Sequence, residues 1–128
     1  NGAREYRLHV TEDGCFLAWR KLRKEDAKDR WFFNSTNCVW VGEDNSSFDK
    51  PTNWNEIIDH SVKALKAVGL SIGAIDVRVA SSLDSSGNKR KTCEFIVLET
   101  NSAPALGEVG SQKYFEEIKR LINKQISK

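Results

Sequence analysis

The sequence has no methionine and is poor in cysteine, histidine and proline, with 3 Cys, 2 His and 2 Pro in 128 residues. Cys15, Cys38 and Cys93 include no C-x-x-C pair, and their odd number argues against a disulfide framework. The two histidines lie far apart, which also disfavours a zinc site. We therefore expect a reducing compartment, the cytoplasm (the host cytoplasm if the source is viral). The missing methionine predicts that the chain is a piece of a longer protein.

Long apolar runs are also missing. No stretch approaches the roughly 20 residues that a membrane-spanning helix needs, and the N-terminus has no secretory signal pattern. Charged residues make up 30% of the chain, but both signs are mixed and the net charge is only +2. That balance is too weak to indicate nucleic-acid binding alone. At 39% hydrophobic, residues 1–128 can bury the core of one domain.

The hydrophobic pattern predicts the order of the elements. Alternation predicts strands at residues 5–10 and 15–20, and strands at 72–80 and 92–99 flank a polar turn. Aromatic and β-branched residues predict a further strand pair at 31–41, broken at residues 34–37. Helical spacing predicts one helix from Asn53 to Gly69, with Glu56 completing a capping-box-like start, and a second from about Ser111. We therefore expect an α+β domain: a mainly antiparallel sheet built from hairpins, with two helices packed on one face.

Two carboxylates are expected to oppose each other in the hairpin over residues 72–99. With a two-residue turn at Gly87-Asn88, Asp76 faces Glu99 and Asn101 follows on the same side. Alternation then predicts a core face of Ile75, Val77, Val79, Ile96 and Leu98. Opposed carboxylates repel unless a cation lies between them, and Mg²⁺ takes such oxygen ligands. The alternative is that both acids are ordinary solvent-face residues, paired with Arg78 or Lys63.

The first hairpin shows the opposite charge. Asp-Gly between alternating runs is a strong hairpin signal, and a turn at Asp13-Gly14 sets Arg7 opposite Arg20. The same register sets Leu8 opposite Trp19. Opposed arginines are unfavourable unless an anion bridges them, and guanidinium binds phosphate in a bidentate manner. A nearby carboxylate such as Glu5 is the alternative partner.

Three stretches together resemble the ATP-grasp superfamily, specifically its carboxylate–amine ligases, including phage-encoded members and those similar to ribosomal-protein glutamate ligases. They are EYRLHV with the following glycine turn and WRKLRKE, then WFFNSTN, and then ALKAVGLSIGAIDVRV with FIVLETNSAPAL. The last is the most specific, because its Asp, its Glu-x-Asn and the following Pro match in type and spacing. The resemblance runs from about Glu5 to Ile122.

The resemblance implies the roles of six residues. It makes Asp76, Glu99 and Asn101 ligands of Mg²⁺ (or Mn²⁺), and it makes Arg7 and Arg20 catalytic contacts to the phosphates of ATP. Asn34 becomes a phosphate-side amide. The implied partners are ATP, a carboxylate and an amine, joined as an amide through an acyl phosphate. The family's N-terminal, nucleotide-clamping half is absent, so the chain is expected to be a C-terminal subdomain that is inactive alone.

Two departures and two other functions accompany this interpretation. Ala105 stands where the family often has glycine, and Phe33 where a related phage segment often has arginine. One alternative is a non-catalytic stand-alone half-domain, for example a viral one, that binds a partner protein. The other is a nucleic-acid module, because basic residues and tryptophans interleave between Trp19 and Trp31. No Ser/His/Asp or Cys/His nucleophile is recognisable.

Overall fold

The computed structural model describes residues 3–23, 38–102 and 108–127, which form an antiparallel sheet with helices. The five strands lie in the order β3-β2-β1-β4-β5. Their bounds are β1 Arg4–Thr11, β2 Gly14–Arg23, β3 Cys38–Gly42, β4 Ile72–Val79 and β5 Phe95–Asn101. The helices are η1 Ser46–Phe48, α1 Trp54–Ala67 and α2 Glu108–Ile126. The predicted α+β class and antiparallel sheet are confirmed; the first half of the expected 31–41 strand pair, with Asn34, lies outside the described residues.

One face of the sheet carries the hydrophobic core. Tyr6, Leu8 and Val10 alternate along β1 and are at most 1% exposed. On β4, Ile75 and Val77 lie opposite Leu8 and Tyr6 and are also buried. Helix α1 covers this core face, where Ile57, Leu65 and Trp54 join the same cluster. The alternate residues of each strand form the opposite face, called here the site face because it carries Arg7, Asp76, Glu99 and Asn101.

Helix α1 begins and ends where predicted, but its N-terminus lacks the predicted capping hydrogen bond. Gly69 has φ +77, and Gly69 N and Leu70 N donate to the carbonyls of Lys66 and Leu65, a Schellman motif. At the other end, Asn53 occupies the N-cap position but makes no capping hydrogen bond. Its side chain instead exchanges two hydrogen bonds, of 2.9 and 3.0 Å, with the backbone of Cys93. Asn53 therefore connects α1 to the segment before β5.

The β1–β2 hairpin has a different register from the predicted one. Its turn is Glu12-Asp13, with Thr11 opposite Gly14, one residue earlier than expected. A bulge at Phe16 adds a residue to β2, a feature that shifts pairing beyond it. Arg7 therefore faces Trp19, not Arg20. Leu8 faces Ala18, so the predicted Leu8–Trp19 pair is wrong as well.

In the β4–β5 hairpin, the predicted pair at the site is confirmed, and the predicted pairs nearer the turn are wrong. Asp76 lies opposite Glu99, as expected. A bulge at Leu98 then shifts the register, so that Arg78 faces Ile96 and not Val97. Ile96 and Leu98 are consequently 61% and 50% exposed, and their predicted place in the core is wrong. Phe95 and Val97 pack against the core instead.

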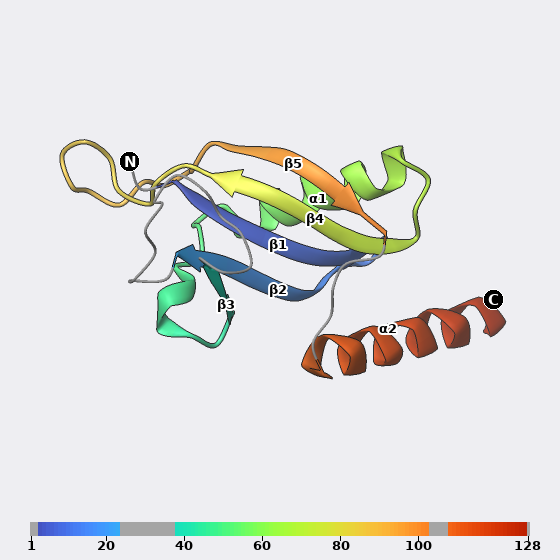
Figure 1. Cartoon of the computed structure of the whole chain (residues 1–128). Helices are drawn as coiled ribbons and strands as arrows, with labels where there is room; N and C mark the ends of the chain where they lie inside the picture. The colour runs from blue at the N-terminus through green and yellow to red at the C-terminus, as the bar shows by residue number, and fades with distance from the viewer. Residues whose placement is uncertain (1–2, 24–37, 103–107, 128) are drawn as a thin grey trace.

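Helix α2 lies apart from α1 (Figure 1). Its Tyr114 contacts His9, which alternates with the core residues of β1 and so lies on the site face. Of the two helices expected on one face of the sheet, α1 covers the core face, whereas α2 contacts the site face. The apolar stripe of α2 is exposed, at Phe115, Ile118, Ile122 and Ile126. None of the helices in the described ranges is long and apolar enough to cross a membrane.

Candidate functional site

The site face brings two carboxylates and an amide together on neighbouring strands. Asp76 of β4 pairs with Glu99 of β5, and Asn101 pairs with Ala74. Alternation on each strand puts all three side chains on the same face. The Asp76 side chain is partly buried, at 23% exposure. The Glu99 side chain is exposed, and its carboxylate accepts no hydrogen bond from the described residues. Two of the predicted ligands are thus directly opposed, and the third lies two residues along the same strand.

Arg7 of β1 binds the first of these carboxylates. It lies opposite Asp76 in the β1–β4 pair, donating from Nε to Oδ1 at 2.8 Å and from Nη2 to Oδ2 at 3.1 Å. Hydrogen bonding to Asp76, together with the negative charges of Asp76 and Glu99, raises the pKa of Arg7 further above its usual range. Such two-point pairing is the strongest arrangement for guanidinium and carboxylate. Arg7 therefore neutralises much of the repulsion between the two acids.

An aromatic ring lies over Arg7 from the sheet edge. The centroid of the Trp40 ring on β3 is 4.8 Å from Arg7 Cζ and 5.5 Å from Lys21 Nζ. Both distances are within the range of cation–π attraction. The ring is 40% exposed, so the two cations and the indole form a surface open to solvent. No local pattern in the sequence indicates this contact, because the pairing of β2 with β3 is needed to bring Trp40 near Arg7.

Two residues along β1, His9 connects the site face to α2. His9 Nδ1 and Tyr114 Oη are 2.6 Å apart, and their rings meet edge to face with centroids 5.2 Å apart. Burial, and next the charge of Arg7, lowers the pKa of His9 to about 4, so the ring is neutral at pH 7. Burial raises the pKa of Tyr114 to about 12. This neutral, buried pair attaches α2 next to Arg7.

Arg20, predicted as the second phosphate contact, does not join the site. It lies opposite Tyr6, a core-face residue, and its Nη1 donates to the carbonyl of Ser47 at 2.7 Å. The predicted pairing of Arg7 with Arg20 is therefore wrong, because the hairpin turns one residue earlier and the Phe16 bulge then moves Arg20 to the core face. Arg20 instead connects β2 to η1.

A different arginine, Arg4, is the most buried cation and was not singled out from the sequence. It is 2% exposed and donates to the carbonyls of Asp49 at 2.6 Å and Ala80 at 2.7 Å. It also pairs with the Asp49 carboxylate at 3.1 Å. These contacts join β1 to the segments before α1 and after β4. The sequence placed Arg4 directly before the first predicted strand, but no pattern in it indicated that the side chain is buried.

Close approach of two backbones holds Asn101 in place. A Cβ at Gly73 would lie 2.9 Å from the carbonyl oxygen of Asn101 and 3.1 Å from Leu65 Cδ1. The first distance is shorter than a carbon can tolerate without movement. Glycine at position 73 therefore allows β5 to lie close enough for Asn101 to follow Glu99 along the strand.

The donor set can be compared with what a divalent cation requires. In the described part of the chain, no group of three or more His, Cys, Asp and Glu side chains could hold a metal ion. Asp76, Glu99 and Asn101 offer only oxygen atoms, which suits Mg²⁺ and Mn²⁺ rather than zinc. Each carboxylate oxygen of Asp76 keeps a second lone pair while it accepts from Arg7. The three residues fit a hard cation that takes its remaining ligands from phosphate or water.

Comparisons with known proteins give a limited likeness. No protein-family model matches the chain, and no curated protein matches it. Among solved structures, it is similar to the ATP-grasp ligase PsnB complexed with a minimal precursor, Mg and ADP, at 22% identity and a TM-score of 0.49, over 87% of this chain and 28% of that one. PsnB with the minimal precursor matches at 24% identity and a TM-score of 0.47, over 84% and 28% of the two chains. The chain thus spans less than a third of the length of these structures.

Proposed function

We propose that this chain is the metal- and phosphate-binding part of an ATP-dependent carboxylate–amine ligase of the ATP-grasp type. The observation that carries the proposal is the opposition of Asp76 and Glu99, with Asn101 on the same face and Arg7 bound to Asp76 from the neighbouring strand. The motifs around these residues support it as well. Residues 1–128 would then be one C-terminal subdomain.

The proposed reaction has two steps. A carboxylate oxygen of the substrate attacks the γ-phosphorus of ATP, the bond to the β,γ-bridging oxygen breaks, and an acyl phosphate and ADP form. An amine then attacks the acyl carbon, inorganic phosphate leaves with the C–O electron pair, and the amine loses a proton to give the amide. When bound, Mg²⁺ or Mn²⁺ would offset the charge of the transferring phosphoryl group.

The residues of this chain have separate roles in that scheme. Glu99, without a hydrogen-bond partner in the described ranges, is the primary carboxylate ligand of the cation. Asp76 is the second, held in orientation by Arg7. Cation binding at Asp76 would loosen its contact with Arg7, whose guanidinium could then turn to a phosphate oxygen. The adenine-binding residues would come from a nucleotide-clamping half outside residues 1–128.

Titration with Mn²⁺ tests the proposal. Calorimetry would be run on the chain with and without a non-hydrolysable ATP analogue at millimolar concentration. We expect binding that strengthens when the analogue is present, because phosphate supplies ligands. Glu99→Gln and Asp76→Asn should each weaken it at least about tenfold. Asp59→Asn, a matched change at an exposed residue of α1, should not. Equal Mn²⁺ affinity in the wild type and Glu99→Gln would refute the metal assignment.

A second candidate is the non-catalytic half-domain that binds a partner protein. The exposed apolar stripe of α2 favours it, because contiguous exposed apolar residues mark interaction surfaces. This candidate requires no metal or nucleotide. The same titration separates the two: binding of Mn²⁺ that depends on Glu99 supports the ligase, and its absence supports the half-domain.

A further inference from the structure

The outer edge of β2 is open along part of its length. β3 pairs with β2 only from Trp19 to Arg23, so within the described chain residues 15–18 have β1 as their sole strand neighbour. After Gly42 the chain turns away, with Asn45 N donating to the Gly42 carbonyl at 3.0 Å. A strand edge of this kind presents unpaired N–H and C=O groups that can pair with an added strand.

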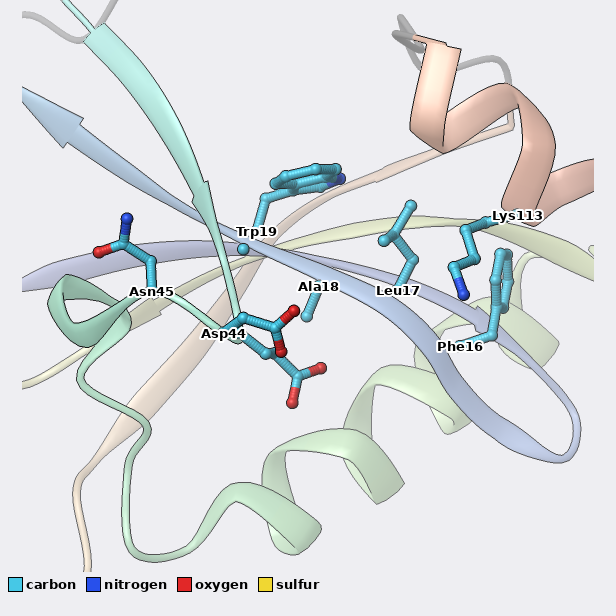
Figure 2. Close-up of a pocket in the computed structure, with 9 residues that line it drawn as sticks. Phe16, Leu17, Ala18, Trp19, Asp44, Asn45 and Lys113 are labelled. Carbon is cyan, nitrogen blue, oxygen red and sulfur yellow. The ribbon is translucent and has the colours of Figure 1, made fainter.

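A hollow follows this open edge (Figure 2). Its volume is about 530 Å³, within the usual range of ligand pockets, roughly 300–1,000 Å³. The lining comes from β2, the turn after β3 and α2, and consists of Phe16, Leu17, Ala18, Trp19, Gly42, Glu43, Asp44, Asn45 and Lys113. The floor is therefore apolar, and the charged residues belong to the turn and the helix.

The two ends of the hollow have opposite charge. Figure 2 shows Asp44 at the Trp19 end of the row of β2 side chains and Lys113 at the Phe16 end. Both are exposed, and neither forms an ion pair with any residue in the described ranges. Glu43, beside Asp44, pairs with Lys50 at 3.0 Å. An occupant should thus have a cationic group at one end and an anionic group at the other.

We propose that this edge binds an extended peptide of another protein, which adds a strand to the sheet beside β2 where β3 leaves it. Antiparallel pairing with β2, the more stable arrangement per residue, gives the peptide the direction of β3. Its N-terminal end then lies near Asp44 and its C-terminal end near Lys113. The preferred ligand is a basic residue, a short β-branched stretch and an acidic residue or free carboxylate. This peptide site lies along the β2 edge and uses none of the proposed metal ligands.

A single strand suits the hollow better than a second copy of the chain does. The open edge covers only about four residues, roughly 13 Å at 3.3 Å per residue, between the 43–45 turn and α2. A peptide enters this space as one ribbon. A second copy would bring its own 43–45 turn and its own α2 to the same short edge, where they would clash with the turn and α2 of the first copy.

The test uses the peptide acetyl-Lys-Val-Thr-Val-Asp-amide and its charge-reversed form, acetyl-Asp-Val-Thr-Val-Lys-amide. Each is titrated into ¹⁵N-labelled protein and followed by amide chemical shifts. We expect saturable shifts at Phe16, Leu17 and Ala18 with the first peptide and weaker binding of the second, by roughly three- to tenfold. A peptide with proline at its central position should bind more weakly still, because it lacks an N–H donor.

Charge exchange in the protein provides the control. The double variant Asp44→Lys with Lys113→Glu keeps the net charge and should reverse the preference between the two peptides. Lys119→Glu, on an exposed part of α2, should leave the preference unchanged. Unchanged preference in the double variant, no shift at residues 16–18 at millimolar peptide, or a concentration-dependent dimer that uses this edge would each overturn the proposal.

Discussion

Arg7 and Asp76 form a two-point ion pair across β1 and β4, at 2.8 and 3.1 Å, although 69 positions separate them in the sequence. The pair is about four-fifths shielded from solvent, since the two side chains are 19% and 23% exposed. It sets the charge of the site face, because Arg7 also lies in the field of Glu99. Its stability can be measured directly.

A double-mutant cycle of Arg7→Gln and Asp76→Asn should give a coupling free energy of about 1–2 kcal/mol in urea unfolding, because the pair is bidentate and partly shielded. Each single variant should lose more than half of the unfolding free energy that the double variant loses, because it leaves one charge without its partner. The exposed Lys50–Glu43 pair is the control, and its coupling should stay below about 1 kcal/mol. A coupling of zero for Arg7 and Asp76 would show that the pair does not stabilise the fold.

Acid should destabilise the protein through His9. Its folded pKa, about 4, is below the ordinary value of 6.5, so between these values the unfolded state binds the proton more tightly. Stability is therefore fully present above pH 6.5 and falls as the pH drops toward 4, by about 1–3 kcal/mol for this group. His9→Gln should flatten the pH dependence of urea unfolding in that window, and His60→Gln should keep it. Parallel curves for the wild type and His9→Gln would contradict this.

Substitution at Gly73 should disturb β5 without removing the side chain of any proposed ligand. Gly73→Ala places a carbon 2.9 Å from the Asn101 carbonyl, and the backbone must shift, at a cost of about 1–3 kcal/mol. The amide resonances of Glu99 and Asn101 should move. Gly42→Ala is the matched control, because its nearest contact, a Trp19 ring carbon at 3.5 Å, is ordinary. Similar losses of stability in the two variants would argue against close approach as the reason for glycine at position 73.

Arg4 should be the arginine on which folding depends most. Arg4→Met keeps much of the side-chain volume but removes the guanidinium that donates to the carbonyls of Asp49 and Ala80 and pairs with the Asp49 carboxylate. The Asp49 side chain is 38% exposed, so the cost is that of acceptors losing a buried donor, about 1–3 kcal/mol for each group left unsatisfied, to be measured by urea unfolding. Arg78→Met, on an exposed residue of β4, should change stability by less than about 0.5 kcal/mol. Equal effects at the two positions would contradict the assignment of Arg4 as a buried clamp.

The opposition of Asp76 and Glu99 was predictable, although the turn that predicted it was not correct. The residue numbers of opposed pairs sum to 172 at the Leu83–Lys89 bridge, 174 at Val79–Phe95 and 175 at Asp76–Glu99. The assumed turn at Gly87-Asn88 gives 175 throughout. The loop is longer than the assumed two-residue turn, and the Leu98 bulge offsets this difference, so the predicted pairing returns at Asp76 and Glu99. The pairs between the loop and the bulge differ from the predicted ones. The core prediction failed at Ile96 and Leu98 for that reason.

Local pattern in the sequence determined the kinds of elements, the end of α1 at Gly69 and the strands that carry Arg7, Asp76 and Glu99. Alternation and helix-terminating glycines act over a few residues, so one sequence suffices to recognise them. Only the tertiary structure decided which side chains meet. The earlier turn and the bulge in β2 together separated Arg7 from Arg20, and strand order brought Arg7 to Trp40 and His9 to Tyr114. Because one extra residue exchanges the two faces of a strand, and these contacts join distant segments, no local pattern specifies them.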